Sequence, residues 1–148
     1  MFKQIVAGTN GSSRGRQVVN VAAELARTHG AKLHIVWAYR TATAMAASAA
    51  SVDLMHSAAI ADHDLLDQVT QGLDQLREEL VRTGIEVETY PCCGGASDAL
   101  LEVATHQNAD LVVVGNKGMH GARRMLGSIP NTIAHHAGCA VLIVPTSG

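Results

Sequence analysis

The sequence predicts a single α/β domain in which a parallel sheet is covered by helices on both faces. Five short apolar runs, typical of strands, alternate with segments whose apolar residues recur every three or four positions. Such an order needs crossover connections and therefore indicates a parallel sheet. The chain has 148 residues, of which 47% are hydrophobic and 16% charged, enough for one domain, residues 1–148, with its own core.

The expected strands differ in their hydrophobic patterns. They cover residues 3–8, 32–39, 85–90, 110–115 and 140–145. The runs "IVA" and "LVVV" in the first and fourth strands are apolar without a break, which is typical of strands buried on both faces. The third run, "IEVETY", alternates and places Glu86 and Glu88 on one side, so we expect it at an edge of the sheet.

The last strand, 140–145, is also continuously apolar, but no helix follows to cover it. If it forms the other edge, its unpaired backbone groups invite a partner strand. We therefore predict a homodimer through residues 140–145. The alternative is a short edge strand that the preceding helix shelters.

Four helices are expected between the strands. The first begins near Ser12 or Ser13 and ends at Gly30, residue types that favour an N-terminal cap and a left-handed C-terminal turn. The other three have apolar residues at helical spacing and centre on 66–80, 100–104 and 126–137. Residues 40–58 lack clear periodicity and are predicted to form a flexible loop or lid, with an alanine-rich extension of the second helix as the alternative.

The stretch "GNKGMHGARRMLGS", 115–128, follows a buried strand and precedes a helix. In an open parallel sheet, ligands gather at the carboxyl ends of the strands, so this loop and "GTNGSS", 8–13, are expected to face each other. Free backbone N–H groups at the start of the fourth helix, with Ser128 as N-cap and basic side chains nearby, favour an anion. The alternative is that glycine occurs in this loop for steric reasons alone and that the basic side chains are solvated. The Gly-Lys-Ser/Thr signature of a phosphate-binding loop is absent.

The whole chain resembles the universal stress protein family, from "IVAGTNGSS" through "KLHIVWAY" and "GGASDALLEVA" to "ADLVVVGNKG" and "LGSIPNTIAHHAGCAVLIVP". The resemblance implies a Rossmann-like sheet of the adenine nucleotide alpha hydrolase type, in the order 3-2-1-4-5, and a dimer through the last strand. Nucleotide-binding members carry Gly, two residues, Gly, nine residues, then Gly and Ser or Thr. Those places are taken here by Gly115, Gly118, Gly127 and Ser128.

Carried over position by position, the resemblance implies an adenine-nucleotide site. The first-strand loop would meet adenine and ribose, Ile35 would contact adenine, and the later glycines and Ser128 would hold phosphates. The predicted site residues are Gly8, Thr9, Asn10, Ile35, Val114, Gly115, Lys117, Gly118, Arg124, Gly127, Ser128, Ile129 and Pro130. The sequence departs from the family pattern twice. The spacer 119–126 has eight residues in place of nine, and Asn10 stands where binders usually have Asp, which weakens the case for a magnesium ion.

We therefore predict an ATP-binding, homodimeric regulator or sensor of the stress response, with at most weak ATP hydrolysis. The alternatives are a nucleotide-free interaction module and a protein that binds cyclic AMP, and AMP is a further possible ligand. The pattern yields no catalytic residue and no metal site, although magnesium remains possible. A net charge of −2 and few aromatic residues argue against nucleic acid, and no apolar run reaches the about eighteen residues of a membrane span. Three cysteines without a paired pattern indicate a cytoplasmic protein. A sensor or regulator also implies a regulatory partner protein, whose identity the sequence does not reveal.

Overall fold

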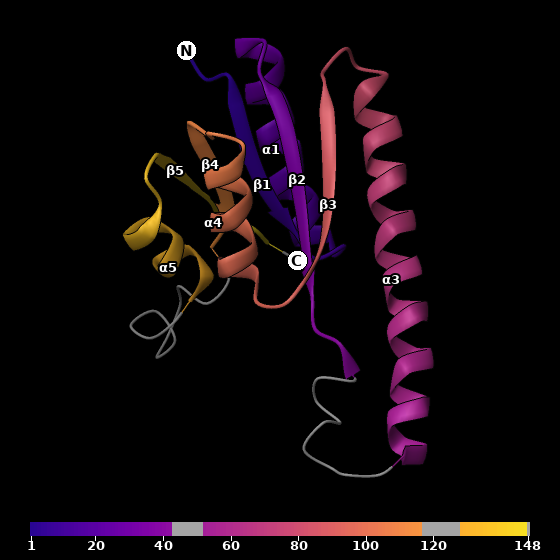
Figure 1. Ribbon diagram of the computed structural model, residues 1–148. Coiled ribbons are helices and arrows are strands. Elements are labelled where there is room, and N and C mark those ends of the chain that lie inside the picture. Colours follow the sequence, from indigo (N-terminus) through magenta and orange to yellow (C-terminus); the bar gives the residue numbers. More distant parts are fainter. Residues whose placement is uncertain (43–51, 117–127, 148) are drawn as a thin grey trace.

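The computed structural model describes residues 1–42, 52–116 and 128–147. Five parallel strands form one sheet in the order β3-β2-β1-β4-β5 (Figure 1). This confirms the predicted α/β class and the strand order that the family resemblance implies. The strands are β1 Gln4–Thr9, β2 Lys32–Tyr39, β3 Val87–Cys93, β4 Leu111–Gly115 and β5 Ala140–Val144.

Helices cover both faces of the sheet and create two separate cores. One core is formed with α1 and α3 and the other with α4 and α5 (Figure 1). Side chains of β1 alternate between them, since Ile5 and Ala7 belong to the first core and Val6 to the second, and all three are fully buried. The helices are α1 Ser13–His29, α3 Val52–Val81, α4 Ala96–His106 and α5 Ile129–His136.

Helix α1 has the bounds that its capping residues predict. The Ser12 side chain accepts a hydrogen bond from the Gly15 backbone N–H at 3.2 Å, which satisfies one of the free donors of the first turn. At the other end, Gly30 adopts the left-handed conformation, with φ of 64°, and its N–H donates to the Ala26 carbonyl. The first turn of α1 therefore starts directly after the loop that leaves β1.

Helix α3 corrects the predicted flexible segment 40–58 in part. Residues 52–58 are helical and begin a helix of 30 residues, as the alternative of an alanine-rich extension expects. Ala58 is buried at 6% exposure, so tertiary packing adds to the helical propensity of this stretch. Residues 43–51 of the predicted lid lie outside the described residues.

Both predicted edge strands are found at the edges. β3 runs from Val87 to Cys93, so it is longer than the expected strand 85–90 and shifted toward the C-terminus. It pairs with β2 along this length, and its last residue, Cys93, lies opposite Tyr39. Ile85 precedes the strand but is still buried in the core, which explains why its apolar character predicted an earlier start. At the opposite edge β5 pairs only with β4 among the described strands, and its middle residues are half-buried.

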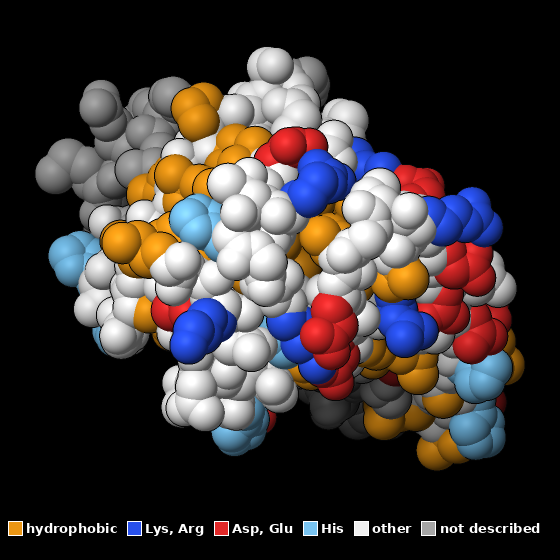
Figure 2. Space-filling model, turned by 90° about the horizontal axis from the view of Figure 1, so that it is seen from above, with side chains coloured by type: hydrophobic (Ala, Val, Ile, Leu, Met, Phe, Trp, Pro, Cys, Tyr) orange, Lys and Arg blue, Asp and Glu red, His pale blue; other side chains and the backbone are white. Residues whose placement is uncertain are grey.

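The end of the molecule at which the strands begin has a mixed surface. Figure 2 shows basic and acidic side chains interspersed there, with hydrophobic side chains between them. Among the described residues, no helix has the length and apolar character that crossing a membrane requires.

Candidate functional site

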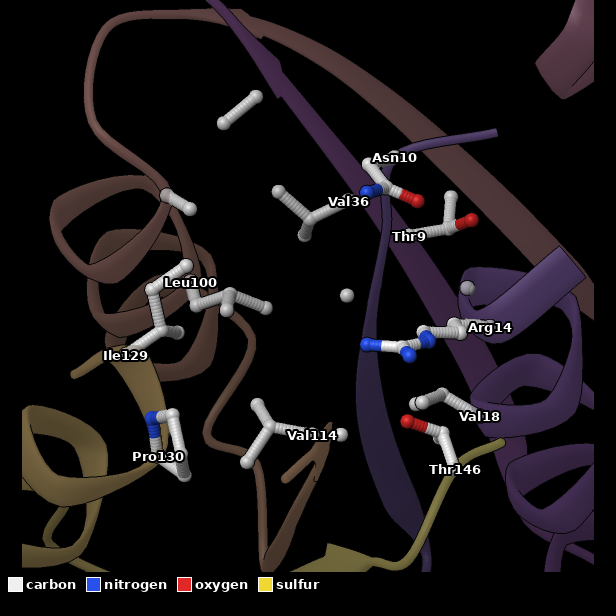
Figure 3. A pocket seen from close by; sticks show the side chains of 15 residues that line it. Thr9, Asn10, Arg14, Val18, Val36, Leu100, Val114, Ile129, Pro130 and Thr146 are labelled. Atoms are coloured by element: carbon white, nitrogen blue, oxygen red, sulfur yellow. The ribbon is translucent and has the colours of Figure 1, made fainter. Parts of the chain in front are cut away.

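A pocket opens at the carboxyl ends of the central strands, where the chain leaves β1 and β4 toward opposite sides of the sheet (Figure 3). This is the position at which open α/β sheets bind ligands. Its walls come from distant segments: the ends of β1, β2 and β4, the first turns of α1, α4 and α5, and the residues that follow β5. The sequence therefore predicted the location of the pocket correctly.

Seven of the predicted site residues line this pocket, namely Gly8, Thr9, Asn10, Val114, Gly115, Ile129 and Pro130. They come from the two loops that the sequence expected to face each other. Four further predicted residues lie outside the described part of the chain, namely Lys117, Gly118, Arg124 and Gly127. Their contribution to the site stays a prediction.

The predicted position of Ile35 in the site is corrected by the structure. Its side chain is fully buried in the core beneath α1 and α3 and is not among the residues that line the pocket. The next residue, Val36, lies on the opposite face of β2 and lines the pocket instead. Side chains alternate along a strand, so transferring the family position with an error of one residue selects a side chain on the wrong face of the sheet.

Ser128 lies at the N-cap of α5, as predicted, but does not itself line the pocket. Its hydroxyl accepts a hydrogen bond from the Asn131 backbone N–H at 3.3 Å, and the residue is 8% exposed. An accepting hydroxyl keeps its own hydrogen to donate. Ile129 and Pro130, the first two residues of the helix, form the adjacent pocket wall (Figure 3).

Glycine lets the pocket walls approach one another closely. A Cβ on Gly15 would lie 2.6 Å from Thr9 Oγ1 and 2.9 Å from Asn10 Oδ1, so only glycine lets α1 start this close to the β1 loop. A Cβ on Gly8 would lie 3.2 Å from the Leu100 side chain and narrow the pocket. The backbone is therefore accessible to a ligand along this wall.

The Asn10 side chain is fixed by its own loop. Its Oδ1 accepts a hydrogen bond from the Ser12 backbone N–H at 3.0 Å and a second from the Ser12 hydroxyl. The amide nitrogen is therefore the end that lies toward the pocket (Figure 3). Where an aspartate would present a negatively charged acceptor, Asn10 presents N–H donors.

Sequence reasoning missed the residues that tertiary packing brings to the pocket. They are Arg14, Gly15, Val18, Val36, Ala38, Ala96, Leu100 and Thr146. Val36, Ala38, Leu100 and Val114 give the pocket an apolar wall suited to a planar ring. Thr146 is positioned by Asn116, whose Oδ1 accepts from the Thr146 backbone N–H at 3.0 Å and from its hydroxyl at 3.1 Å.

Arg14 is the charged residue among the described pocket-lining residues, and none of those residues is Asp or Glu. It lies in the first turn of α1, and Figure 3 shows its guanidinium group reaching into the pocket. The signal that could have found it is its position in the first helical turn, directly after the β1 loop. On sequence alone it was indistinguishable from a solvated helix charge.

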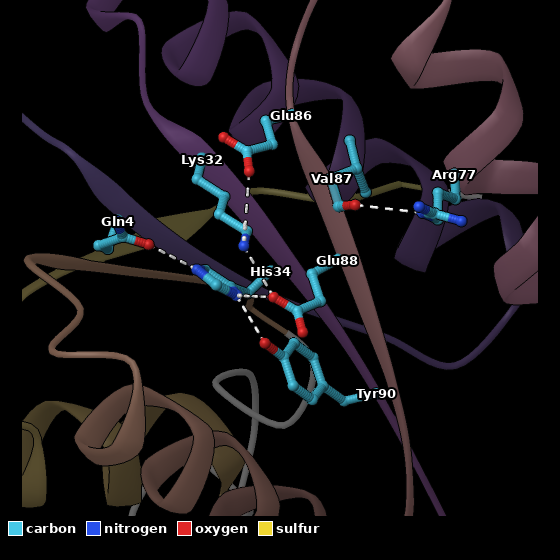
Figure 4. Close-up of polar contacts among 8 residues, drawn as sticks. All are labelled: Gln4, Lys32, His34, Arg77, Glu86, Val87, Glu88 and Tyr90. Carbon is cyan, nitrogen blue, oxygen red and sulfur yellow. Dashed lines mark hydrogen bonds and ion pairs between the residues drawn. The ribbon is translucent and has the colours of Figure 1, made fainter.

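A buried polar cluster lies on the α4 face of the sheet, two residues before Val36 on β2 (Figure 4). The fully buried His34 contacts Gln4 Oε1 through Nε2 at 2.7 Å and the Tyr90 hydroxyl through Nδ1 at 2.8 Å. Burial, with the nearby Lys32 as a second cause, lowers the pKa of His34. His34 therefore has a structural environment with its hydrogen bonds satisfied, and no group of His, Cys, Asp or Glu suited to a metal ion occurs in the described part of the chain.

The fold agrees with what comparison with known proteins finds. The model of the universal stress protein family matches residues 1–145, and the chain belongs to this family. Universal stress protein Rv1636 of Mycobacterium tuberculosis is 34% identical over 99% of this chain and 98% of its own length. Universal stress protein YxiE of Bacillus subtilis is 25% identical over 97% of this chain and 99% of its own length.

Solved structures show the same fold. A universal stress protein crystallised in complex with cAMP has a TM-score of 0.75 at 30% identity, over 99% of this chain and 98% of the other. The crystal structure of Rv1636 from M. tuberculosis has a TM-score of 0.59 at 32% identity, over 99% and 97%. The protein MJ0577, at 14% identity, has a TM-score of 0.79 over 100% and 99%, which concerns the fold alone.

Proposed function

We propose that the protein binds an adenine nucleotide in the pocket at the ends of β1 and β4 and acts as a homodimeric regulator or sensor in the stress response. The observation that carries this proposal is the pocket itself, at the switch point of a parallel sheet. The relative crystallised with cAMP, 30% identical over nearly the whole chain, supports an adenine nucleotide as the ligand.

The two ends of the pocket suit the two ends of a nucleotide. The apolar wall of Val36, Leu100 and Val114 would hold the adenine ring, since an aromatic base gains from burial against aliphatic side chains. The start of α5 would face the phosphate, because the helix dipole and the Ile129 N–H favour an anion there. Pro130 has no N–H to add, and the N–H groups of Asn131 and Thr132 already donate to Ser128. ATP, AMP and cyclic AMP share these features and remain candidates for the ligand.

The described residues that line the pocket favour nucleotide binding, with at most weak hydrolysis. The described residues that line the pocket include no carboxylate and no histidine that could act as a general base. Homodimerisation through residues 140–145 is supported by the position of β5 at the edge of the sheet. A cytoplasmic location is part of the same proposal, supported by three cysteines that are all free.

Isothermal titration of the purified protein with ATP, AMP and cyclic AMP tests this function, with GMP as the matched control for the base. We expect saturable binding of at least one adenine nucleotide and weaker binding of GMP. Small molecules released from the denatured protein should be separated by anion exchange to find a ligand that copurifies. If no adenine nucleotide binds at millimolar concentration and none copurifies, the protein is a nucleotide-free interaction module instead.

A further inference from the structure

We propose that Arg14 binds the phosphate group of a nucleoside phosphate in this pocket and neutralises it without a divalent cation. This inference rests on the nucleotide-binding function proposed above and adds a residue and a charge-balancing mechanism to it. It concerns a side chain that the glycine and serine pattern of the sequence did not indicate.

The first argument is geometric. Arg14 leaves the first turn of α1 beside Thr9 and Val18, and its guanidinium group extends across the pocket toward the wall that contains Leu100 and Ile129 (Figure 3). A phosphate at the start of α5 would thus lie between the N-terminus of one helix and the side chain of another. Guanidinium groups bind phosphate through two parallel N–H donors, which orients as well as attracts the ligand.

The second argument is the cost of placing a positive charge there. Arg14 lies in the first turn of α1, which contains no acidic residue, and a cation near a helix N-terminus opposes the helix dipole. Arg16, two residues later, has partners: it forms an ion pair with Glu79 and donates to Asn20 at 3.1 Å. No ion pair of Arg14 is found within residues 1–42, 52–116 and 128–147. Arg14 is exposed, so water solvates its charge in the absence of a ligand, and no described carboxylate competes with an anion for its guanidinium group.

The third argument concerns magnesium, for which the described donors are unsuited. Mg²⁺ in nucleotide sites is held by one or two carboxylates together with phosphate oxygens. The lining residues supply no carboxylate, and the Asn10 oxygen already accepts from the Ser12 backbone. The amide nitrogen of Asn10 and the guanidinium group of Arg14 are donors, which repel a cation and attract an anion.

The test compares AMP with adenosine by isothermal titration, in EDTA and in magnesium chloride, for the wild type and three variants. In Arg14→Gln we expect AMP to bind about 10- to 100-fold more weakly and adenosine to bind unchanged, because only the phosphate loses its charged partner. Arg14→Lys should recover part of the loss, since it restores the charge without the planar fork. Arg27→Gln, at the other end of α1 and paired with Glu24, is the matched control and should bind AMP like the wild type.

The outcomes separate this inference from the function on which it rests. If the wild type binds AMP and Arg14→Gln binds it equally well, the role of Arg14 is refuted while nucleotide binding stands. If wild-type AMP binding disappears in EDTA, the metal-free mechanism is wrong. If the wild type binds neither AMP nor adenosine, the proposed function fails and this inference fails with it.

Discussion

The Tyr90 hydroxyl of β3 donates a hydrogen bond to Nδ1 of His34 on β2, at 2.8 Å. The direction of this bond follows from the other ring nitrogen. Burial lowers the pKa of His34 and so favours the neutral ring. Gln4 Oε1 can only accept, so Nε2 of the neutral ring carries the hydrogen and Nδ1 is left as an acceptor (Figure 4). Three adjacent strands are thereby joined by side chains inside a core that is otherwise apolar.

Replacing Tyr90 with Phe should destabilise the fold by about 1 to 3 kcal/mol, because the buried Nδ1 of His34 would lose its donor. Urea denaturation followed by circular dichroism measures the change. Tyr39→Phe is the matched control, since no hydrogen bond of its hydroxyl is found among the described residues, and it should cost less. Equal losses in the two variants would show that the His34 contact contributes nothing specific.

The same histidine predicts how stability depends on pH. Burial lowers the pKa of His34 in the folded protein, so the unfolded chain binds a proton more readily. The free energy of unfolding should therefore fall as the pH drops below about 6.5, the usual value for histidine, by at most about 1.4 kcal/mol per pH unit from this group. The hydrogen bond from Lys32 lowers the pKa of Glu88, which adds a second loss only below about 4.5.

The contribution of His34 thus falls between pH 6.5 and 5. Urea denaturation at several pH values should give a flatter profile for His34→Gln than for the wild type in this interval. An unchanged slope in His34→Gln would assign the pH dependence to other groups.

Gly11 and Gly30 both have positive φ, at 78° and 64°, but their surroundings differ. A Cβ on Gly11 would overlap the indole ring of Trp37, whereas nothing lies within 4 Å of a Cβ on Gly30. Gly30→Ala should cost about 1 to 2 kcal/mol from the left-handed backbone alone, and Gly11→Ala about 1 to 3 kcal/mol more because the ring must move. Chemical denaturation measures both, and the fluorescence of the single tryptophan should change only in Gly11→Ala.

Much of this fold could be predicted because local chemistry and burial agree. Ser12 and Gly30 set the ends of α1 by capping, and the alternation of Glu86 and Glu88 identified an edge strand. The start of α3 could not be predicted in the same way, since an alanine-rich stretch suits a helix and a loop almost equally until Ala58 packs. Where propensity is neutral, tertiary contacts decide.

The candidate site was likewise predictable only in those parts that local sequence determines. Backbone features were predictable, because glycine after a buried strand marks a close approach and Ser128 before an apolar stretch marks an N-cap. Side chains from other segments were not, since Arg14 and Thr146 reach the pocket only through the packing of α1 and the chain after β5. The prediction of Ile35 was wrong for a different reason. Neighbouring side chains of a strand lie on opposite faces of the sheet, so an error of one residue selected a core side chain in place of a pocket side chain.

The proposed homodimer makes a clear prediction for β5. Ile143 is half-buried on the edge strand, so Ile143→Lys would place a charge in the interface and should weaken the dimer at least about tenfold. Sedimentation equilibrium should give about 31 kDa for the wild type, twice the chain mass of 15.5 kDa, and a shift toward monomer for the variant. Ile60→Lys, exposed on α3, is the control. A wild type that is monomeric at all concentrations, or an Ile143→Lys variant that stays dimeric, would contradict assembly through this edge.

Ser128 offers a way to separate folding from ligand binding at the start of α5. Ser128→Ala removes the side-chain acceptor for the Asn131 N–H and should cost about 1 kcal/mol of stability. Ser128→Asp keeps an acceptor of good capping geometry and adds a charge that the helix dipole favours, so its stability should stay within about 0.5 kcal/mol of the wild type.

Beside a bound phosphate, however, the Ser128→Asp carboxylate repels the ligand. AMP binding should therefore weaken more than about tenfold in Ser128→Asp, while adenosine, which has no phosphate, binds as before. Urea denaturation and isothermal titration on the same samples measure both effects. Wild-type affinity for AMP in Ser128→Asp would mean that the phosphate does not lie at the N-terminus of α5.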